Sequence, residues 1–201
     1  MDDRAALCDL RAFFGPRAAG WEDRYADDGA QFARAVRECA PRARATVLDL
    51  GCGTGRALPY LRAAVGARGR VIGLDATPEM LGEATRLGRR EVAALVLGDV
   101  GRLPFPAGSV DLVFAGGLLP HLTDPAAGLA EVARVTRAGG RLAIFHAIGR
   151  VALAARHGGV PADDDVIAPR RLHDLLATTG WTLYALDDAP ERFLALASRA
   201  V

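Results

Sequence analysis

The sequence contains no lysine: all 25 of its basic residues are arginine, and 24 acidic residues bring the formal net charge to +1. The arginines are dispersed along the chain, and the pairs at 89–90 and 170–171 are too short to form a track for a polyanion. This charge pattern argues against a nucleic acid as the partner.

Cysteine is scarce as well. Cys8, Cys39 and Cys52 are well separated, and none of them has the spacing of a metal-ligand pair. Three consecutive acids at 163–165 have no histidine or further acid at a ligand spacing, so we interpret them as a solvated loop. We therefore expect no metal site and free thiols rather than disulfides.

Long apolar runs are also absent. No run reaches the roughly 18 residues that a membrane helix needs, and the first residues, MDDR, contain no apolar signal region. The length of 201 residues and the hydrophobic content of 51% suit one domain with a large core. We expect a cytoplasmic protein without a membrane segment.

The most informative stretch is VLDLGCGTGR at 47–56, where a leucine-rich strand leads into three closely spaced glycines. Because Gly51, Gly53 and Gly55 lack a Cβ, their backbone can adopt strained dihedrals and place N–H groups against a ligand at a helix N-terminus. The spacing is not the G-x-G-x-x-G of dinucleotide folds, and no Gly-Lys-Ser/Thr follows for a triphosphate. The stretch predicts a nucleotide or nucleoside cofactor site, with a purely structural turn as the alternative.

Two further predicted strands lead to an acid. RVIGLD at 70–75 ends at Asp75, and a helix capped by Thr77 follows. In an open parallel sheet, ligands bind at the carboxyl ends of the strands, where Asp75 suits a ribose diol. The third strand, 92–97, leads to Asp99, which can accept a hydrogen bond from the amine of a purine.

These motifs, together with GDVGRLPFPAGSVDLVFAGGLLPHL at 98–122 and AGLAEVARVTRAGGRLAIF at 127–145, resemble the class I S-adenosylmethionine-dependent methyltransferases. The chain is similar to the small-molecule group that includes the ubiquinone and menaquinone biosynthesis enzymes, over residues 21–201. The resemblance implies an α/β, three-layer, Rossmann-like fold with a seven-stranded, mostly parallel sheet and an antiparallel last strand. Residues 181–187 and 192–198 read as the closing hairpin that is typical of this sheet.

The resemblance also implies a cofactor, S-adenosyl-L-methionine, with S-adenosyl-L-homocysteine as its product. Gly51 and Gly53 would lie against the methionine part of the cofactor, and Asp49, just ahead of the loop in the sequence, would bind the cofactor as well. Cys52 would fill a small space beside the cofactor rather than act as a nucleophile. Asp75 would bind the ribose hydroxyls. The other implied positions are Ala76 and Met80 along the nucleoside, Asp99 and Val100 around the adenine, and the backbone of Ala115 or Gly116 at the amino group.

The N-terminal part, 1–44, precedes the first strand and reads as two or three helices. By resemblance it folds as a lid over a methyltransferase core at 45–201, within one domain overall. Aromatic residues at helical spacing usually pack helices together. Trp21 and Tyr25, one helical turn apart, are our candidates for substrate contact instead.

The implied chemistry needs a nucleophile held in line with the C–S bond of the sulfonium and shielded from water. General-base help is optional, and His121 is the best candidate, followed by His146. The alternative role for His121 is that of an orienting or helix-capping imidazole.

The sequence therefore predicts methyl transfer to a small, partly apolar acceptor, with O-methylation favoured over N- or C-methylation. The Asn-Pro-Pro-Tyr signature of enzymes that methylate amide or adenine nitrogens is absent after the fourth strand. One alternative is a non-methylating reaction such as cyclisation or decarboxylation, and another is a silent subunit that binds the cofactor and activates a partner. A homodimer, in which a second subunit covers the site, also stays open.

Overall fold

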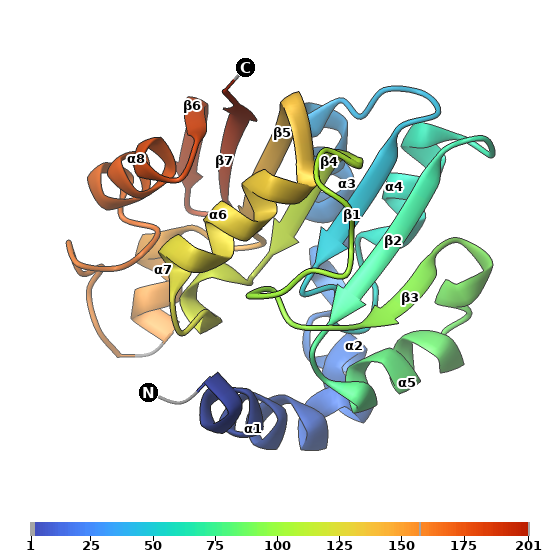
Figure 1. Ribbon diagram of the computed structural model, residues 1–201. Helices are drawn as coiled ribbons and strands as arrows, with labels where there is room; N and C mark the ends of the chain where they lie inside the picture. The colour runs from blue at the N-terminus through green and yellow to red at the C-terminus, as the bar shows by residue number, and fades with distance from the viewer. Residues whose placement is uncertain (1–2, 157, 201) are drawn as a thin grey trace.

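A central sheet with helices on both faces forms three layers in the computed structural model, which describes residues 3–156 and 158–200 (Figure 1). The predicted ranges therefore reach outside the described residues at 1–2 and at 201. The seven strands lie in the order β3-β2-β1-β4-β5-β7-β6. Their bounds are β1 Thr46–Leu50, β2 Arg70–Asp75, β3 Ala94–Leu97, β4 Val110–Gly116, β5 Thr136–His146, β6 Trp181–Ala189 and β7 Arg192–Arg199.

Strands β1 to β5 pair in parallel, and β7 lies antiparallel between β5 and β6. This arrangement confirms the predicted fold class. The strands β1, β2 and β3 follow one another toward one edge of the sheet, and β4 then pairs with β1 on the side away from β2. The order of the strands therefore reverses between β1 and β4. Such a switch point, outside the carboxyl ends of the strands, is where open α/β sheets bind ligands.

Alternate residues of the strands supply the two hydrophobic layers, because successive side chains of a strand point to opposite faces. Val47 packs with the helices α3 (Gly29–Cys39) and α4 (Leu58–Val65). Leu48 packs on the other face, with α6 (Pro125–Val135) and α8 (Pro169–Thr178). Helices thus cover both faces and leave the strand ends as the place for a site.

The N-terminal segment is helical, as expected; residues 3–24 run beneath the carboxyl ends of the strands, whereas α3 packs on a face of the sheet (Figure 1). Its elements are the helices α1 (Asp3–Phe14), α2 (Trp21–Arg24) and α3, and the 3₁₀ turns η1 (Gly15–Gly20) and η2 (Ala26–Asp28). The remaining elements are α5 (Pro78–Arg86), η3 (Arg89–Glu91), η4 (Leu119–His121) and α7 (Arg150–Arg156).

Two predicted strand boundaries are wrong. The third strand starts at Ala94 instead of Val92, because η3 places Val92 in helical backbone. The fifth strand, which the sequence predicts over 141–146, starts at Thr136, since Thr136 pairs with Val110 across an irregular register. Neither difference moves the carboxyl ends, which position the site.

Candidate functional site

A cavity of about 1010 Å³ lies between the carboxyl ends of the strands and the N-terminal helices. Every predicted site residue except Ala115 lines it. Ala115 is buried in the hydrophobic core, whereas its neighbour Gly116 reaches the cavity. The lining residues named from sequence are Trp21, Tyr25, Asp49, Gly51, Cys52, Gly53, Asp75, Ala76, Met80, Asp99, Val100, Gly116, His121 and His146.

The glycine loop between β1 and α4 depends on backbone that other residues rarely adopt. Gly51 has φ +68° and Gly53 has φ +54°. The N–H groups of Gly51 and Cys52 both donate to the carbonyl oxygen of Leu74, at 2.8 and 3.0 Å, which ties the loop to the end of β2. A Cβ on Gly51 would lie 2.8 Å from Leu118 Cδ1, so the loop and the segment after β4 approach too closely for a side chain.

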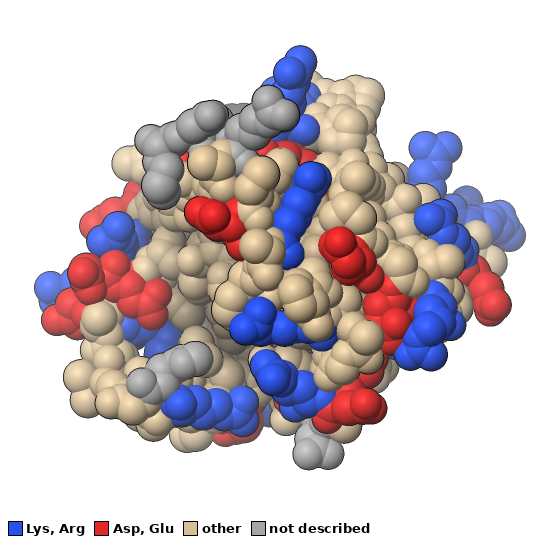
Figure 2. Space-filling model, turned by 90° about the horizontal axis from the view of Figure 1, so that it is seen from below, with Lys and Arg blue, Asp and Glu red and all other residues tan. Residues whose placement is uncertain are grey.

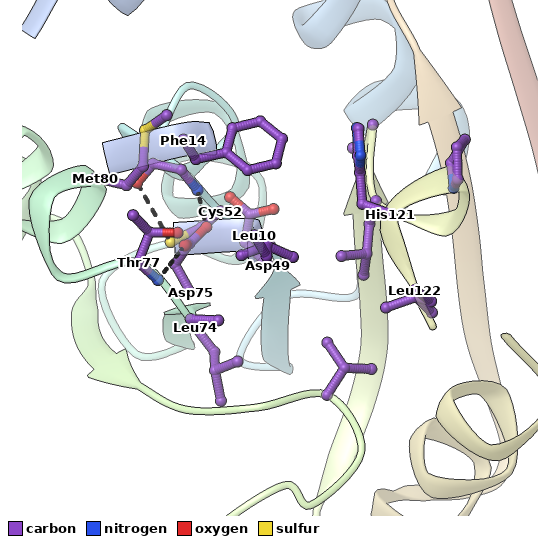
Figure 3. A pocket seen from close by; sticks show the side chains of 18 of the residues that line it. Leu10, Phe14, Asp49, Cys52, Leu74, Asp75, Thr77, Met80, His121 and Leu122 are labelled. Atoms are coloured by element: carbon purple, nitrogen blue, oxygen red, sulfur yellow. Dashed lines mark hydrogen bonds between the residues drawn. The ribbon is translucent and has the colours of Figure 1, made fainter. Parts of the chain in front are cut away.

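Asp75, at the end of β2, holds the glycine loop and the start of α5 with one carboxylate. Its Oδ2 accepts from the Gly53 N–H at 2.7 Å, and its Oδ1 accepts from the Thr77 N–H at 2.8 Å (Figure 3). Burial raises the pKa of Asp75, and these backbone N–H groups oppose that rise. Thr77 occupies the predicted N-cap position, but its side chain makes no capping bond. The prediction that Thr77 caps this helix with its side chain is therefore wrong, and its backbone N–H donates to Asp75 instead.

Asp49 is buried at the base of the cavity, and its Oδ2 has no hydrogen-bond partner among the described residues. Burial, with a smaller contribution from the neighbouring Asp75, raises its pKa to about 8. A buried carboxylate oxygen without a partner is costly unless a ligand supplies a donor or a positive charge. The base of the cavity is thus suited to a cationic group.

Cys52 is buried behind the loop, where its Sγ would lie 2.9 Å from a Cβ on Gly73. Burial raises its pKa well above the ordinary value, and the nearby Asp49 and Asp75 add to the effect. The side chain is a neutral thiol in a tight space, which suits a packing role.

Arg56, from the same glycine motif, clamps the N-terminal segment onto the loop. Its guanidinium donates to the Tyr25 carbonyl oxygen and lies 3.4 Å from Asp28 Oδ2 and 3.9 Å from Glu22 Oε1. The hydroxyl of Thr54, in the loop, also donates to Glu22. The clamp positions the segment that carries Trp21 and Tyr25, whose ring centroids lie 4.9 Å apart.

Helix α1 closes the cavity from below. Arg11 Nε donates to the carbonyl oxygen of Ala76 at 2.7 Å, which fixes the helix over the end of β2. Phe14, at the end of α1, meets the ring of His121 edge-on with centroids 5.0 Å apart. Figure 3 shows Phe14 and Leu10 on one side of the cavity and His121 across from the glycine loop.

The two predicted histidines both reach the cavity, His121 from η4 and His146 from the end of β5. Burial lowers the pKa of His121. Burial, helped by His121 and opposed by Asp165, lowers the pKa of His146 to about 4. The Nε2 atom of His146 is buried without a hydrogen-bond partner among the described residues. Both rings are therefore neutral at pH 7 and able to accept or donate a hydrogen bond.

We expect the buried His146 to make the free energy of unfolding depend on pH. Between its ordinary pKa and about 4, the unfolded chain binds a proton that the folded chain refuses, so stability is lost as the pH falls through this window. The loss at pH 5 is about 2 kcal/mol. His146→Gln should show a smaller drop in urea-unfolding free energy between pH 7 and 5 than the unsubstituted protein.

His173→Gln, on the exposed face of α8, is the matched control and should leave the drop unchanged. An identical pH dependence in His146→Gln and the unsubstituted protein would show that His146 does not titrate as its burial implies.

Several lining residues were missed from sequence. Leu10, Phe14 and Arg156 line the cavity, and Arg56 and Glu22 hold the clamp. Arg56 lies within the recognised glycine motif, but no spacing rule connects it to residues 22–28. These contacts join segments that are distant in sequence and have no shared periodicity.

Within the described residues, no group of three or more histidine, cysteine or acidic side chains could hold a metal ion. None of the helices in this same part of the chain is long and apolar enough to cross a membrane.

Comparison with known proteins gives a family match in the region that carries the glycine loop. Residues 48–144 match the family model described as methyltransferase domain. An uncharacterized 37.1 kDa protein in transposon TN4556 of Streptomyces fradiae is 47% identical over 98 residues, which cover 48% of this chain and 28% of that protein. Demethylmenaquinone methyltransferase of Beutenbergia cavernae is 43% identical over 98 residues, which cover 49% of this chain and 39% of that protein.

The chain spans less than half the length of each of these curated relatives. Among solved structures, a SAM-dependent methyltransferase from Aquifex aeolicus superposes with a TM-score of 0.71 at 23% identity, covering 84% of this chain and 89% of that one. At this identity the likeness concerns the fold. Residues 48–144 are therefore similar to a methyltransferase domain, and the chain has the fold of the class I S-adenosylmethionine-dependent methyltransferases.

Proposed function

We propose that the protein transfers the methyl group of S-adenosyl-L-methionine to an oxygen atom of a small, partly apolar acceptor. The observation that carries this proposal is the orphaned Asp49 oxygen at the base of a large cavity whose loop is built from glycine backbone. Bound there, the cofactor supplies an electrophilic methyl carbon on a sulfonium. The demethylmenaquinone methyltransferase relative supports a small-molecule acceptor.

The residues at the methionine end fit this cofactor. Asp49 offers a buried, unpartnered carboxylate oxygen to a positively charged group, and Gly51 and Gly53 offer backbone without side chains. A Cβ on Gly53 would lie 3.9 Å from Met80 Sδ, so the open space over the loop lies beside an apolar wall. We infer that Asp49 and the loop hold the amino acid part, with the backbone of Gly116 across from them.

The residues at the nucleoside end fit as well. Each oxygen of Asp75 accepts one backbone N–H and has capacity for a further donor, which a ribose hydroxyl would supply. Ala76 and Met80 lie beside it, and Asp99 and Val100 line the cavity after β3. We infer that these residues bind the ribose and the adenine.

The N-terminal helices act as a lid in this proposal, because the Arg56 clamp and the Arg11 bond fix them over the cavity. Water must be excluded while the acceptor oxygen lies in line with the methyl carbon. The neutral ring of His121 faces the cavity from η4 and would accept the proton of an acceptor hydroxyl. His146, with a pKa of about 4, is the weaker base and the second candidate.

The test is a calorimetric titration with S-adenosylmethionine and S-adenosylhomocysteine, followed by an assay for labelled methyl transfer to a panel of hydroxylated aromatic compounds. We expect micromolar-range binding and transfer to at least one hydroxyl. Absence of binding would refute the proposal. Binding without transfer to any compound would favour the silent subunit or a non-methylating reaction.

His121→Ala should lower the turnover number about 100-fold, because general-base help is typically of this size, while the affinity for S-adenosylhomocysteine stays within twofold. The measurement is a rate profile from pH 6 to 9 with the acceptor found above. In the unsubstituted protein, activity should persist at neutral pH and fall only in acid, where the ring becomes protonated.

His173→Ala is the control for loss of an imidazole, since this ring lies on an exposed face of α8. Equal turnover of His121→Ala and the unsubstituted protein across neutral pH would assign His121 an orienting role instead.

A further inference from the structure

We propose that the acceptor is an aromatic carboxylate and that Arg156, at the end of α7, binds its carboxylate group. This inference rests on the proposed function and deepens it, because it names the class of acceptor that the outer part of the cavity selects. It is carried by three observations: an apolar and aromatic wall, the position of Arg156 on the far side of β4 from β2 and β3, and the lack of an ion pair between Arg156 and any described side chain.

The part of the cavity away from the glycine loop is lined mostly by apolar side chains. Rings gather on the N-terminal side, where Phe14 meets Trp21 with centroids 5.7 Å apart and at an interplanar angle of 61°. Aromatic walls favour flat ring systems, which they contact edge-on or stacked. Aliphatic residues complete this wall from α1, from the segments after β4 and β5 and from α7: Leu7, Leu10, Leu122, Ile148 and Leu153.

Acidic and basic residues both line the cofactor side of the cavity, where Arg56 follows β1 and Arg102 follows β3. Asp49, Asp75 and Asp99 follow β1, β2 and β3, which form one side of the sheet. Helix α7 follows β5, on the other side of β4, and Figure 1 shows it away from β2 and β3. The cofactor side thus carries charges of both signs, and Arg156 supplies a cation on the acceptor side.

Arg156 is not engaged elsewhere in the described part of the chain, in contrast to Arg56. Arg56 is held by Glu22 and Asp28, whereas no described side chain forms an ion pair with Arg156. A guanidinium presents a rigid fork of donors that matches a carboxylate. An apolar wall with Arg156 at its outer end, free of ion pairs to described side chains, suits a molecule with an apolar body and one anionic end.

Helix α7 is held in place at its other end. The Arg150 N–H donates to Asp188 Oδ1 at 2.9 Å, and its guanidinium donates to the Ala162 carbonyl oxygen at 2.8 Å and lies 3.5 Å from Asp165. These contacts attach the start of α7 to β6 and to the loop before α8. Arg156 thus projects from an anchored helix rather than from a free loop.

The surface around the carboxyl ends of the strands has no field of a single sign. Figure 2, which looks onto the molecule from below, shows arginine and acidic side chains interspersed on this face. Selection of an anion would therefore depend on the local cation and not on long-range attraction.

The hydrogen-bonding group at the inner end of this wall is His146. Its buried Nε2 has no partner among the described residues, although the ring lines the cavity. A hydroxyl on the acceptor would satisfy this nitrogen, while the carboxylate reaches Arg156. The acceptor is thus recognised by one polar group at each end of an apolar body.

The test compares 6-hydroxy-2-naphthoate with 6-hydroxy-2-naphthamide, which carry their polar groups at opposite ends of the ring system and differ in charge but have nearly the same shape. Each is titrated calorimetrically into the full chain saturated with S-adenosylhomocysteine. We expect the naphthoate to bind about fivefold more tightly than the amide at low salt, and this preference to shrink as salt is added.

Arg156→Gln should remove the preference by weakening naphthoate binding about fivefold, with the amide unaffected, and Arg156→Lys should restore part of it. Arg170→Gln, at an exposed position on α8 outside the cavity, is the matched control and should change neither affinity. S-adenosylhomocysteine affinity should be the same in all four proteins.

Equal binding of the two probes, or failure of both to bind a protein that binds S-adenosylhomocysteine, would overturn the inference and leave the proposed function intact. A parallel loss of S-adenosylhomocysteine affinity in Arg156→Gln would overturn it too, by assigning Arg156 to the cofactor carboxylate. No S-adenosylhomocysteine binding to the unsubstituted protein would instead refute the proposed function.

Discussion

Asp75→Asn should reduce S-adenosylhomocysteine affinity about 100-fold, because the charged acceptor serves both the protein backbone and the ribose hydroxyls. In the folded chain the carboxylate accepts the N–H groups of Gly53 and Thr77 through separate oxygens. An amide has only one acceptor oxygen, so one of these buried N–H groups loses its partner and the glycine loop shifts. The ribose hydroxyls lose the charged acceptor at the same position. Calorimetry measures the affinity.

Asp163→Asn is the matched control, since it makes the same chemical change at an exposed loop residue and should leave the affinity unchanged. Circular dichroism of Asp75→Asn separates lost binding from lost folding, and we expect a native spectrum with a lowered melting temperature. Wild-type affinity in a folded Asp75→Asn protein would contradict the assignment of the ribose to this side chain.

Phe114→Ala should destabilise the fold by about 3–5 kcal/mol, a typical cost of emptying a fully buried aromatic site. Phe114 lies on β4 with none of its surface exposed. Its ring contacts Phe145 and Phe32, with centroid distances of 5.6 and 6.2 Å, so it joins two central strands to the neighbouring helix α3. For a chain of this size we expect a melting temperature about 10 °C lower.

Phe13→Ala is the control for this substitution, because Phe13 is 50% exposed at the surface of α1. Its cost should stay below about 1 kcal/mol. Similar urea midpoints for the two variants would mean that the contacts among Phe32, Phe114 and Phe145 stabilise the fold no more than packing at the surface does.

Much of the fold could be predicted because its signals are local. The run 47–56 contains both a buried strand and the glycines that its turn requires, so strand, loop and helix follow from adjacent residues. The acid at the end of β2 was also predictable, since the carboxyl ends of parallel strands meet at one edge. Thr77 shows the limit of such reasoning: it occupies the expected cap position, but a carboxylate two residues earlier takes its backbone N–H.

The clamp and the acceptor wall could not be predicted in the same way. Arg56 meets the Tyr25 carbonyl oxygen across 31 residues of sequence, and Arg11 meets that of Ala76 across 65. Contacts of this kind leave no periodic pattern, because they depend on how the N-terminal helices dock on the finished sheet. The exclusion of Ala115 from the cavity has the same origin, since one step along β4 changes the face to which a side chain points.

The sequence by itself determined the parallel sheet, the glycine loop and the acids at the strand ends, because strand periodicity and backbone freedom are properties of neighbouring residues. Only the tertiary structure decided which polar atoms have no partner among the described residues: Asp49 Oδ2 and His146 Nε2 are enclosed by strands and helices from separate parts of the chain. It also decided that Glu22 and Asp28 pair with Arg56, whereas no described side chain forms an ion pair with Arg156. Burial and pairing depend on long-range packing, which converts a residue type into a chemical role.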